Sequence, residues 1–341
     1  MISRGTGRFG WLLGYGLAIA ALALPAAPQY KVVKHFALGG EGGWDALTVD
    51  SSARRVYVSR GTRVMVVDAD TGKPVGEIPD TPGVHAVALA PKLNKGFISA
   101  GRANNVVVFD LETLKSSGTV AAGENPDLIL YEPHTRRVFA FNGRSKNVTV
   151  IDAESQKVLT TIPLPGKPEF ATFDGHGRVF VNIEDKGTVA VIDASSMKVG
   201  KEMSMSPCEE PTGLAMDRKK GRLFAGCSGN KVMAVMEAGS GKLLASVPIG
   251  AGCDGTEFDA SVGLAFAANG RDGTLTVVGE TSPGKFEAVQ TVTTQVSGRT
   301  LALDEKTHQL FIPVAKLQPP AAPGQRPTME PGTFELLVVG R

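Results

Sequence analysis

Short runs of β-branched and other apolar residues recur along the chain at a nearly constant interval. The clearest copies are residues 64–68, 106–110, 148–152 and 189–193, which read VMVVD, VVVFD, VTVID and VAVID. Weaker copies end at Met236 and Gly279, so that successive ends are 42, 42, 41, 43 and 43 residues apart, and a last copy at 336–340 comes late. Spacing this regular indicates a repeat architecture.

Each repeat contains four short apolar segments, seen most clearly in the third copy. They cover residues 128–131, 138–141, 148–151 and 158–162, and glycine, proline, asparagine or aspartate separates them. This pattern predicts four antiparallel strands joined by tight turns, here called a to d in chain order. Such a sheet has two apolar faces, which are buried when neighbouring copies pack around an axis. No segment of the mature chain keeps a helical apolar period over three turns.

The repeats predict an all-β, seven-bladed β-propeller of four-stranded antiparallel blades. Six complete units lie between Asp45 and Gly298, and a seventh has only three of its four strands, at 300–304, 310–314 and 334–339. We expect the apolar segment 30–38 to supply the missing outermost strand and close the ring. The proline-rich insert 317–332 falls between the second and third strands of the last blade and is expected to form an extended or mobile loop.

The N-terminus has the layout of a secretory signal peptide. Arg4 and Arg8 precede the apolar stretch 11–24, and the small residues at 25–27 suggest cleavage near Ala26. We therefore expect a signal peptide at 1–26, a single propeller domain at 27–341, and a periplasmic or secreted protein. An uncleaved anchor is the alternative, although about 14 apolar residues fall short of the roughly 20 that span a bilayer. No later segment could span one.

The charge balance argues against nucleic acid as a partner. The chain has 36 basic and 34 acidic residues, and removal of Arg4 and Arg8 leaves 34 of each. A neutral protein has no overall field to attract phosphate backbones. Only 2 Trp and 4 Tyr are available to stack on bases. We expect a monomer.

Three sequence features together resemble the YVTN repeat of exported bacterial propellers. They are the d-to-a loop Gly-Glu-Asn-Pro at 123–126, the b strand Val-Phe-Ala-Phe-Asn at 138–142 and the c strand Val-Thr-Val-Ile-Asp at 148–152. The resemblance covers nearly the whole mature chain, and YncE-like propellers are the most similar in style. It implies a periplasmic propeller; some members of this group are reported to bind nucleic acid, which the neutral charge disfavours here.

The loops after strands b and d emerge on one face of a propeller, called here the mouth face because it surrounds the opening of the central channel. Alignment of the seven a strands places one residue of each blade at this opening. These seven ring residues are Asp45, His85, Asp127, Glu169, Thr212, Asp254 and Arg299. Converging carboxylates repel one another unless a cation intervenes, so calcium or another divalent cation could bind at Asp127, Glu169 and Asp254. Neutralisation by Arg299, water and backbone amides is the alternative.

Arginines recur in the b-to-c loops of the same face. They are Arg60, Arg102, Arg144 and Arg271, and the last three follow a glycine. Guanidinium groups placed outside the ring could bind a carboxylate or phosphate ligand or the acidic patch of a protein partner. Pairing with neighbouring Asp and Glu residues is the ordinary alternative.

The chain has three cysteines, Cys208, Cys227 and Cys253, and an oxidising compartment favours one disulfide and one free thiol. We expect a bridge between Cys253 and one of the others, first Cys208–Cys253, which would join equivalent loops 45 residues apart. No Cys-x-x-Cys-His motif for haem attachment and no Cys-x-x-Cys motif for zinc is present.

These features predict a binding module that takes a small polar ligand or a protein partner on the mouth face without turnover. The alternative is a lactonase or lactonising enzyme, because such chemistry needs an acid/base pair beside a cationic group. His85, Glu169 and Arg299 would form that set.

Overall fold

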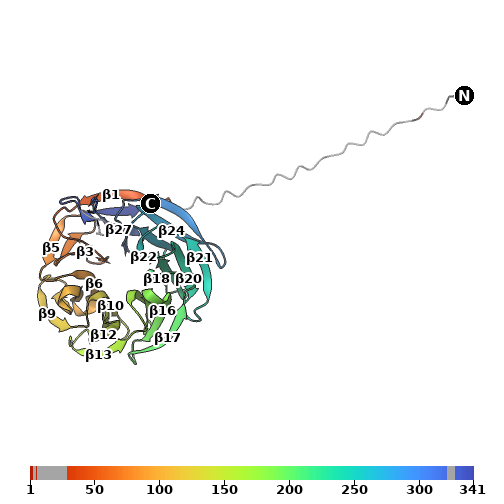
Figure 1. Ribbon diagram of the computed structural model, residues 1–341. Helices are drawn as coiled ribbons and strands as arrows, with labels where there is room; N and C mark the ends of the chain where they lie inside the picture. The colour runs from red at the N-terminus through yellow and green to blue at the C-terminus, as the bar shows by residue number, and fades with distance from the viewer. Residues whose placement is uncertain (3–4, 6–28, 321–326) are drawn as a thin grey trace.

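The computed structural model describes residues 1–2, 5, 29–320 and 327–341, and it forms a closed ring of blades (Figure 1). Seven antiparallel sheets of four strands make up this ring, so the predicted seven-bladed propeller is confirmed. Almost all of the predicted signal peptide, residues 1–26, lies outside the described residues. No helix in the described part of the chain is long and apolar enough to cross a membrane.

Each of the first six blades consists of four consecutive strands, ordered a to d from the channel outward. Blade 1 contains β2 (Leu47–Asp50), β3 (Arg55–Arg60), β4 (Arg63–Asp68) and β5 (Pro74–Ile78). Blade 2 contains β6 (Val84–Ala90), β7 (Lys95–Ala100), β8 (Asn105–Asp110) and β9 (Ser116–Ala121). Blade 3 contains β10 (Pro126–Glu132), β11 (Arg137–Asn142), β12 (Asn147–Asp152) and β13 (Val158–Pro163).

The second half of the ring continues this order and ends with the closing blade. Blade 4 contains β14 (Pro168–Phe173), β15 (Arg178–Ile183), β16 (Thr188–Asp193) and β17 (Lys198–Ser204), and blade 5 contains β18 (Pro211–Asp217), β19 (Arg222–Cys227), β20 (Val232–Glu237) and β21 (Leu243–Pro248). Blade 6 contains β22 (Cys253–Asp259), β23 (Leu264–Asn269), β24 (Thr274–Ser282) and β25 (Lys285–Thr293). Blade 7 contains β26 (Ala302–Asp304), β27 (Gln309–Val314), β30 (Glu335–Gly340) and β1 (Lys31–Ala37). Single 3-10 turns are η1 (Pro91–Leu93), η2 (Gly101–Ala103) and η3 (Glu184–Lys186).

The N-terminal strand closes the ring as expected. β1 pairs antiparallel with β30, with Val32 opposite Val339 and His35 opposite Leu337, so the two ends of the chain share blade 7. In the seventh blade the order is therefore β26, β27, β30 and β1. A sheet built from both termini holds the two chain ends together, and each blade keeps only short edges at its first and outermost strands.

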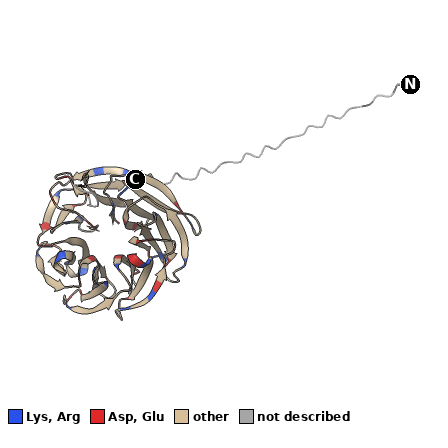
Figure 2. Cartoon of the chain, in the orientation of Figure 1, with Lys and Arg blue, Asp and Glu red and all other residues tan. Residues whose placement is uncertain are grey.

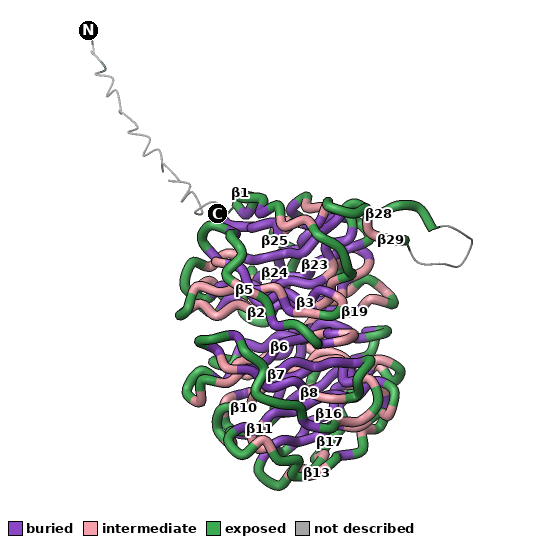
Figure 3. Tube along the Cα trace, turned by 90° about the vertical axis from the view of Figure 1, so that its left-hand side faces the viewer, coloured by how far each residue is buried: buried purple, intermediate pink, exposed green. Residues whose placement is uncertain are grey.

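The proline-rich insert lies between β27 and β30, as the repeat predicts. Its ends pair as a short ribbon of β28 (Leu317–Gln318) and β29 (Thr328–Met329), with Leu317 opposite Met329. Figure 3 shows this ribbon projecting from one side of the ring. Residues 321–326 lie outside the described part, so the rest of the predicted loop is not described.

The hydrophobic core lies between the blades. The second and third strands of each blade are almost completely buried, as in β11 and β12, whereas the outermost strand β13 exposes most of its residues. Each apolar cluster joins neighbouring blades; one of them packs Phe97 and Val108 of blade 2 with Val138 and Ala140 of blade 3. The repeated β-branched segments seen in the sequence are thus the residues that hold adjacent blades together.

Candidate functional site: the channel mouth

The ring residues meet at the mouth because each lies at the start of an a strand. In blades 2 to 6 the register between strands a and b shifts beside the ring residue; in blade 3, for example, the shift lies between Pro126 and Ile129. Such irregularities release a residue from the regular ladder and redirect its side chain. The repeated loop before each a strand therefore places one side chain per blade around the axis.

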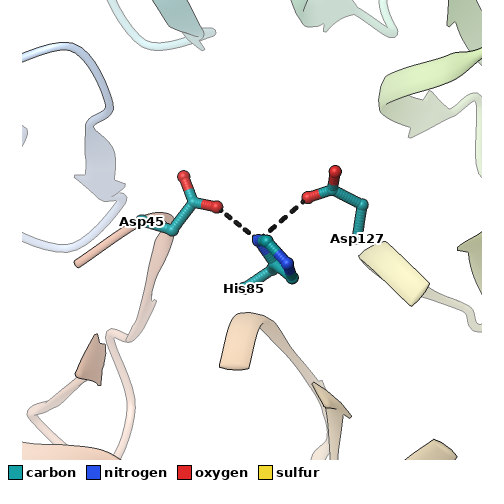
Figure 4. A group of neighbouring side chains, drawn as sticks. All are labelled: Asp45, His85 and Asp127. Carbon is teal, nitrogen blue, oxygen red and sulfur yellow. Dashed lines mark hydrogen bonds and ion pairs between the residues drawn. The ribbon is translucent and has the colours of Figure 1, made fainter. Parts of the chain in front are cut away.

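His85 lies between two carboxylates from the neighbouring blades (Figure 4). Its Nδ1 is 2.7 Å from Oδ2 of Asp45 and 3.2 Å from Oδ1 of Asp127. Burial alone would lower the pKa of His85, but the hydrogen bond with Asp45 and the charge of Asp127 outweigh it and raise this pKa above the ordinary 6.5. The imidazole therefore links blades 1, 2 and 3, and the two carboxylates favour its protonated form.

Arg299 extends this arrangement in the opposite direction. Its Nε donates to Oδ2 of Asp254 at 2.7 Å, and a terminal nitrogen donates to Oδ1 of Asp45 at 3.1 Å. Together with His85 this gives a continuous chain of alternating charge across five blades, called here the charged arc. Its members in spatial order are Asp254, Arg299, Asp45, His85 and Asp127.

The carboxylates of the arc are held in a protein environment that resists their ionisation. Burial raises the pKa of Asp127 to about 6, with His85 opposing this effect and Asp45 and Asp254 adding to it. Burial also raises the pKa of Asp254, against the opposing charge of Arg299. Asp127 therefore titrates closer to neutral pH than an ordinary aspartate, and shifted carboxyl groups of this kind are common at functional sites.

Glu169 stands apart from the arc and has its own cation. Lys167 lies 2.6 Å from Glu169 and also contacts Glu184, from the b-to-c loop of the same blade. Burial and the nearby Asp127 raise the pKa of Glu169, and Lys167 opposes this shift. Thr212 is buried and donates to the carbonyl of Cys253 at 2.8 Å. The ring thus contains its own counter-charges, as one of the two sequence interpretations anticipated.

The metal prediction named Asp127, Glu169 and Asp254. Among the described residues, the group close enough to share one ion is instead Asp45, His85 and Asp127, whose ligand atoms lie within 4.8 Å of one another. One imidazole nitrogen with two carboxylate oxygens suits zinc or manganese better than calcium, which prefers oxygen ligands alone. A metal here would have to replace the proton that His85 shares with its two neighbours.

The arginines of the b-to-c loops divide into two classes. Arg102, Arg144 and Arg271 are exposed on the mouth face, and their backbone N–H groups donate to equivalent d-to-a loop carbonyls, those of Pro82, Glu124 and Ala251. None of the three forms an ion pair within the described part of the chain. Three of the four predicted arginines are therefore exposed beside the mouth, and their role in binding stays a prediction.

The prediction that Arg60 contacts a ligand on the mouth face is wrong. Arg60 is fully buried, its guanidinium lies 3.7 Å from the centre of the Phe334 ring, and it donates to the carbonyls of Gly39 and Glu41. Burial lowers the pKa of Arg60 to about 10. Because its blade neighbours the closing blade, this arginine is used to attach the N-terminal segment and cannot reach a ligand at the surface.

The predicted disulfide Cys208–Cys253 is wrong, because the structure pairs Cys208 with Cys227. Pro211 lies opposite Cys227 in the β18–β19 pair, so the d-to-a loop that carries Cys208 folds over the end of the b strand of its own blade. Cys253 is free and buried, with its sulfur against Gly226 between blades 5 and 6. Burial raises the pKa of this thiol, which makes it unreactive.

Comparison with known proteins agrees with this architecture. No family model matches the chain, and no curated protein matches it. Among solved structures, RRP9 WD40 repeats match with a TM-score of 0.73 at 9% identity, covering 92% of this chain and 99% of that one. A chain of a Mitotic Checkpoint Complex matches with a TM-score of 0.71 at 14% identity, covering 89% and 95%. Kuenenia stuttgartiensis Hydrazine Synthase gives 0.51 at 17% identity, covering 70% and 96%.

These similarities show the fold alone. At such identities they carry no activity or partner to this chain.

Sequence reasoning missed several residues that determine how the site behaves. Lys167 precedes the proline of its d-to-a loop, where the third blade has Asn125 and the fifth has Glu210. Aligning that position across the repeats would have revealed a basic residue next to Glu169. Asn125 was also missed; its side chain lies beside His85 and helps to keep the imidazole charged. Its place next to His85 depends on the close approach of blades 2 and 3 at Gly101.

Proposed function

We propose that this protein is an exported binding module of the YVTN type that captures a protein partner on its mouth face without turnover. The observation that carries this proposal is the set of three exposed arginines, Arg102, Arg144 and Arg271, in equivalent positions of three blades. Their guanidinium groups suit the carboxylates of an acidic segment. One solved propeller of this fold belongs to a chain of a Mitotic Checkpoint Complex, which illustrates the fold within an assembly.

Two structural details indicate that the arginines are positioned for binding before a partner arrives. A Cβ at Gly83 would lie 2.5 Å from the side chain of Arg102, and one at Gly252 would lie 2.7 Å from that of Arg271, so both arginine stems lie closely against glycine. The ring carboxylates beneath them are already paired with His85, Arg299 and Lys167, and Asp272 accepts the backbone N–H of Ala251. The ring carboxylates are thus paired within the ring, and the arginines keep their capacity for a partner.

The test compares two triple charge reversals. Changing Arg102, Arg144 and Arg271 to Glu should abolish capture of the partner from an extract of the source cells. The control changes Lys92, Lys219 and Lys306 to Glu, because these exposed lysines lie in the a-to-b turns of the opposite face. Capture by wild type and control, lost in the arginine variant and weakened by salt, supports the proposal. Equal loss in both variants, or capture unaffected by the arginine change, contradicts it.

The lactonase alternative rests on the Asp45–His85 pair and on the carboxyl groups that titrate near neutral pH. The three residues predicted for it do not contact one another in the described structure: His85 contacts Asp45 and Asp127, Glu169 contacts Lys167, and Arg299 contacts Asp254 and Asp45. Following acid release from simple lactones by pH-stat tests this alternative directly. Turnover that disappears in His85→Gln would establish the enzyme, and we expect no turnover.

A further inference from the structure

The central channel contains a cavity that none of the seven ring residues lines. It has a volume of about 1000 Å³ and is lined by the a strands of all seven blades, from Ala46 of blade 1 round to Leu303 of blade 7. The lining starts one or two residues after the ring and continues into the a-to-b turns, which contain Lys92, Arg136 and Arg218. The cavity therefore belongs to the opposite face from the mouth and is large enough for a small molecule.

The walls of this cavity combine apolar and polar residues, and four aromatic side chains contribute to them. Tyr131, Phe170, Phe173 and Phe258 all line it and are only partly buried by the protein. Aromatic faces of this kind interact favourably with apolar groups and with organic cations. The mixed walls therefore suit an amphiphilic molecule.

Glu257 is a half-buried carboxyl group in the wall of this cavity. It occupies the third position after the ring along its a strand, where the other six blades have the uncharged residues Thr48, Ala88, Leu130, Thr172, Ala215 and Ala302. No ion pair within 4.0 Å involves Glu257 in the described part of the chain. A carboxyl group without a cationic partner in the wall of a cavity is available to a cationic ligand that enters it.

The groups around Glu257 act on it from the adjacent blades. Burial raises the pKa of Glu257 to about 8, Glu305 of blade 7 adds to the shift, and Arg218 of blade 5 and the backbone N–H of Leu303 oppose it. Arg218 is itself engaged, because its Nε donates to the carbonyl of Phe173 and its guanidinium lies 4.3 Å from the centre of that ring. Without a ligand, Glu257 is mostly a neutral acid at pH 7.

We propose that this cavity binds a small amphiphilic amine, with the ammonium group on Glu257 and the apolar part against the aromatic side chains. Binding ionises Glu257: its proton leaves to solvent, and the carboxylate pairs with the ammonium nitrogen. An aliphatic alcohol of the same size would gain only the apolar contacts, and a carboxylate would be opposed by Glu257 and Glu305. The site is on the face opposite to the proposed protein surface and does not depend on it.

The test uses three probes of one size, 4-phenylbutylamine, 4-phenylbutanol and 4-phenylbutyrate, titrated calorimetrically into the mature protein. Above pH 8 we expect the amine to bind at least tenfold more tightly than the alcohol or the acid. Because binding releases a proton, the affinity for the amine should fall about tenfold between pH 7 and pH 6. The alcohol should show no such dependence.

Two variants separate the carboxyl group from the general shape of the channel. Glu257→Gln should remove both the amine preference and its pH dependence while leaving alcohol binding unchanged. Glu305→Gln, an equal charge change at the exposed exit of the same cavity, should retain the amine preference. Preference retained in Glu257→Gln, tighter binding of the acid, or no binding of any probe at millimolar concentration would overturn the proposal. The pH series on the wild type tests it even if the variant folds poorly.

Discussion

Two parts of the channel mouth are held by different kinds of interaction, ion pairs in one and a disulfide in the other. Blades 6, 7, 1, 2 and 3 are linked by the charged arc, in which every neighbour is an opposite charge. Blade 5 has a threonine in the ring instead, and its mouth loop is tied to its own b strand by Cys208–Cys227. We call this second side the covalent arc. Ionic links respond to pH and salt, whereas a disulfide responds to reductant, so the two sides should fail under different conditions.

The largest expected effect is on the covalent arc. Replacing Cys208 and Cys227 together by Ala should lower the free energy of unfolding by about 3 kcal/mol. The reason is that the bridge restricts the conformational entropy of the unfolded chain, and its loss stabilises the unfolded state. The loss should be the same at pH 6 and pH 8. Urea denaturation measures it, and reduction of the wild type should reproduce it.

Cys253→Ala serves as the matched control for this experiment. It removes a buried thiol of the same region without touching the bridge, so its cost should be smaller and unaffected by reductant. If the double variant were as stable as this control, the covalent arc would contribute nothing measurable and the comparison would fail.

A smaller effect is expected in the charged arc. Asp45 is shared by His85 and Arg299, so Asp45→Asn removes the carboxylate that links blade 7 to blade 2. We expect a loss of about 2 kcal/mol in unfolding free energy, the range for partly buried charged hydrogen bonds. High salt should reduce this loss, because the pairs are partly exposed to solvent and salt weakens them in the wild type.

Asp70→Asn is the control for Asp45→Asn. Asp70 pairs with Arg54 on the outer surface, where its side chain is 56% exposed. Such surface pairs contribute below about 1 kcal/mol. Equal losses in the two variants would mean that the arc is no more than a set of surface ion pairs.

The repeat made the arc partly predictable. Alignment of the a strands in the sequence predicts that the seven ring residues share one rim, because a propeller assigns one spatial position to each position of the repeat. The same argument could not choose disulfide partners. Cys208 and Cys253 occupy equivalent loops, but equivalence fixes the face and leaves open which sulfur approaches which. The turn of the blade 5 loop over β19 decides that.

Departures from the repeat were the harder part to predict. Arg60 ends its b strand, two positions before the place that the other three arginines occupy in their blades, and the N-terminal segment covers it through a contact between residues that no repeat relates. Glu257 was overlooked for the opposite reason, since it interrupts a position that is otherwise small or apolar. Its role depends on a cavity that forms only when all seven blades are assembled.

The smallest effect concerns the pH dependence of the charged arc. Asp127 has a folded-state pKa of about 6, above its unfolded value, and the pKa of His85 is raised above 6.5. In each case the folded protein holds its proton more tightly than the unfolded chain does. Stability should therefore fall as pH rises, first from about 4 to 6 through Asp127 and then above 6.5 through His85.

Measurement of the His85 pKa by NMR separates these contributions from the rest of the molecule. The ring protons should titrate above 6.5 in the wild type, and Asp45→Asn should lower the pKa of His85 by removing the hydrogen bond that raises it most. Asp127→Asn should lower it less and should reduce the fall in unfolding free energy between pH 4 and 6, to which Glu169 and Glu257 also contribute because their pKa values are raised as well. A His85 pKa below 6.5 in the wild type would mean that burial outweighs both carboxylates. The imidazole would then be neutral, and the charged arc would end at Asp45.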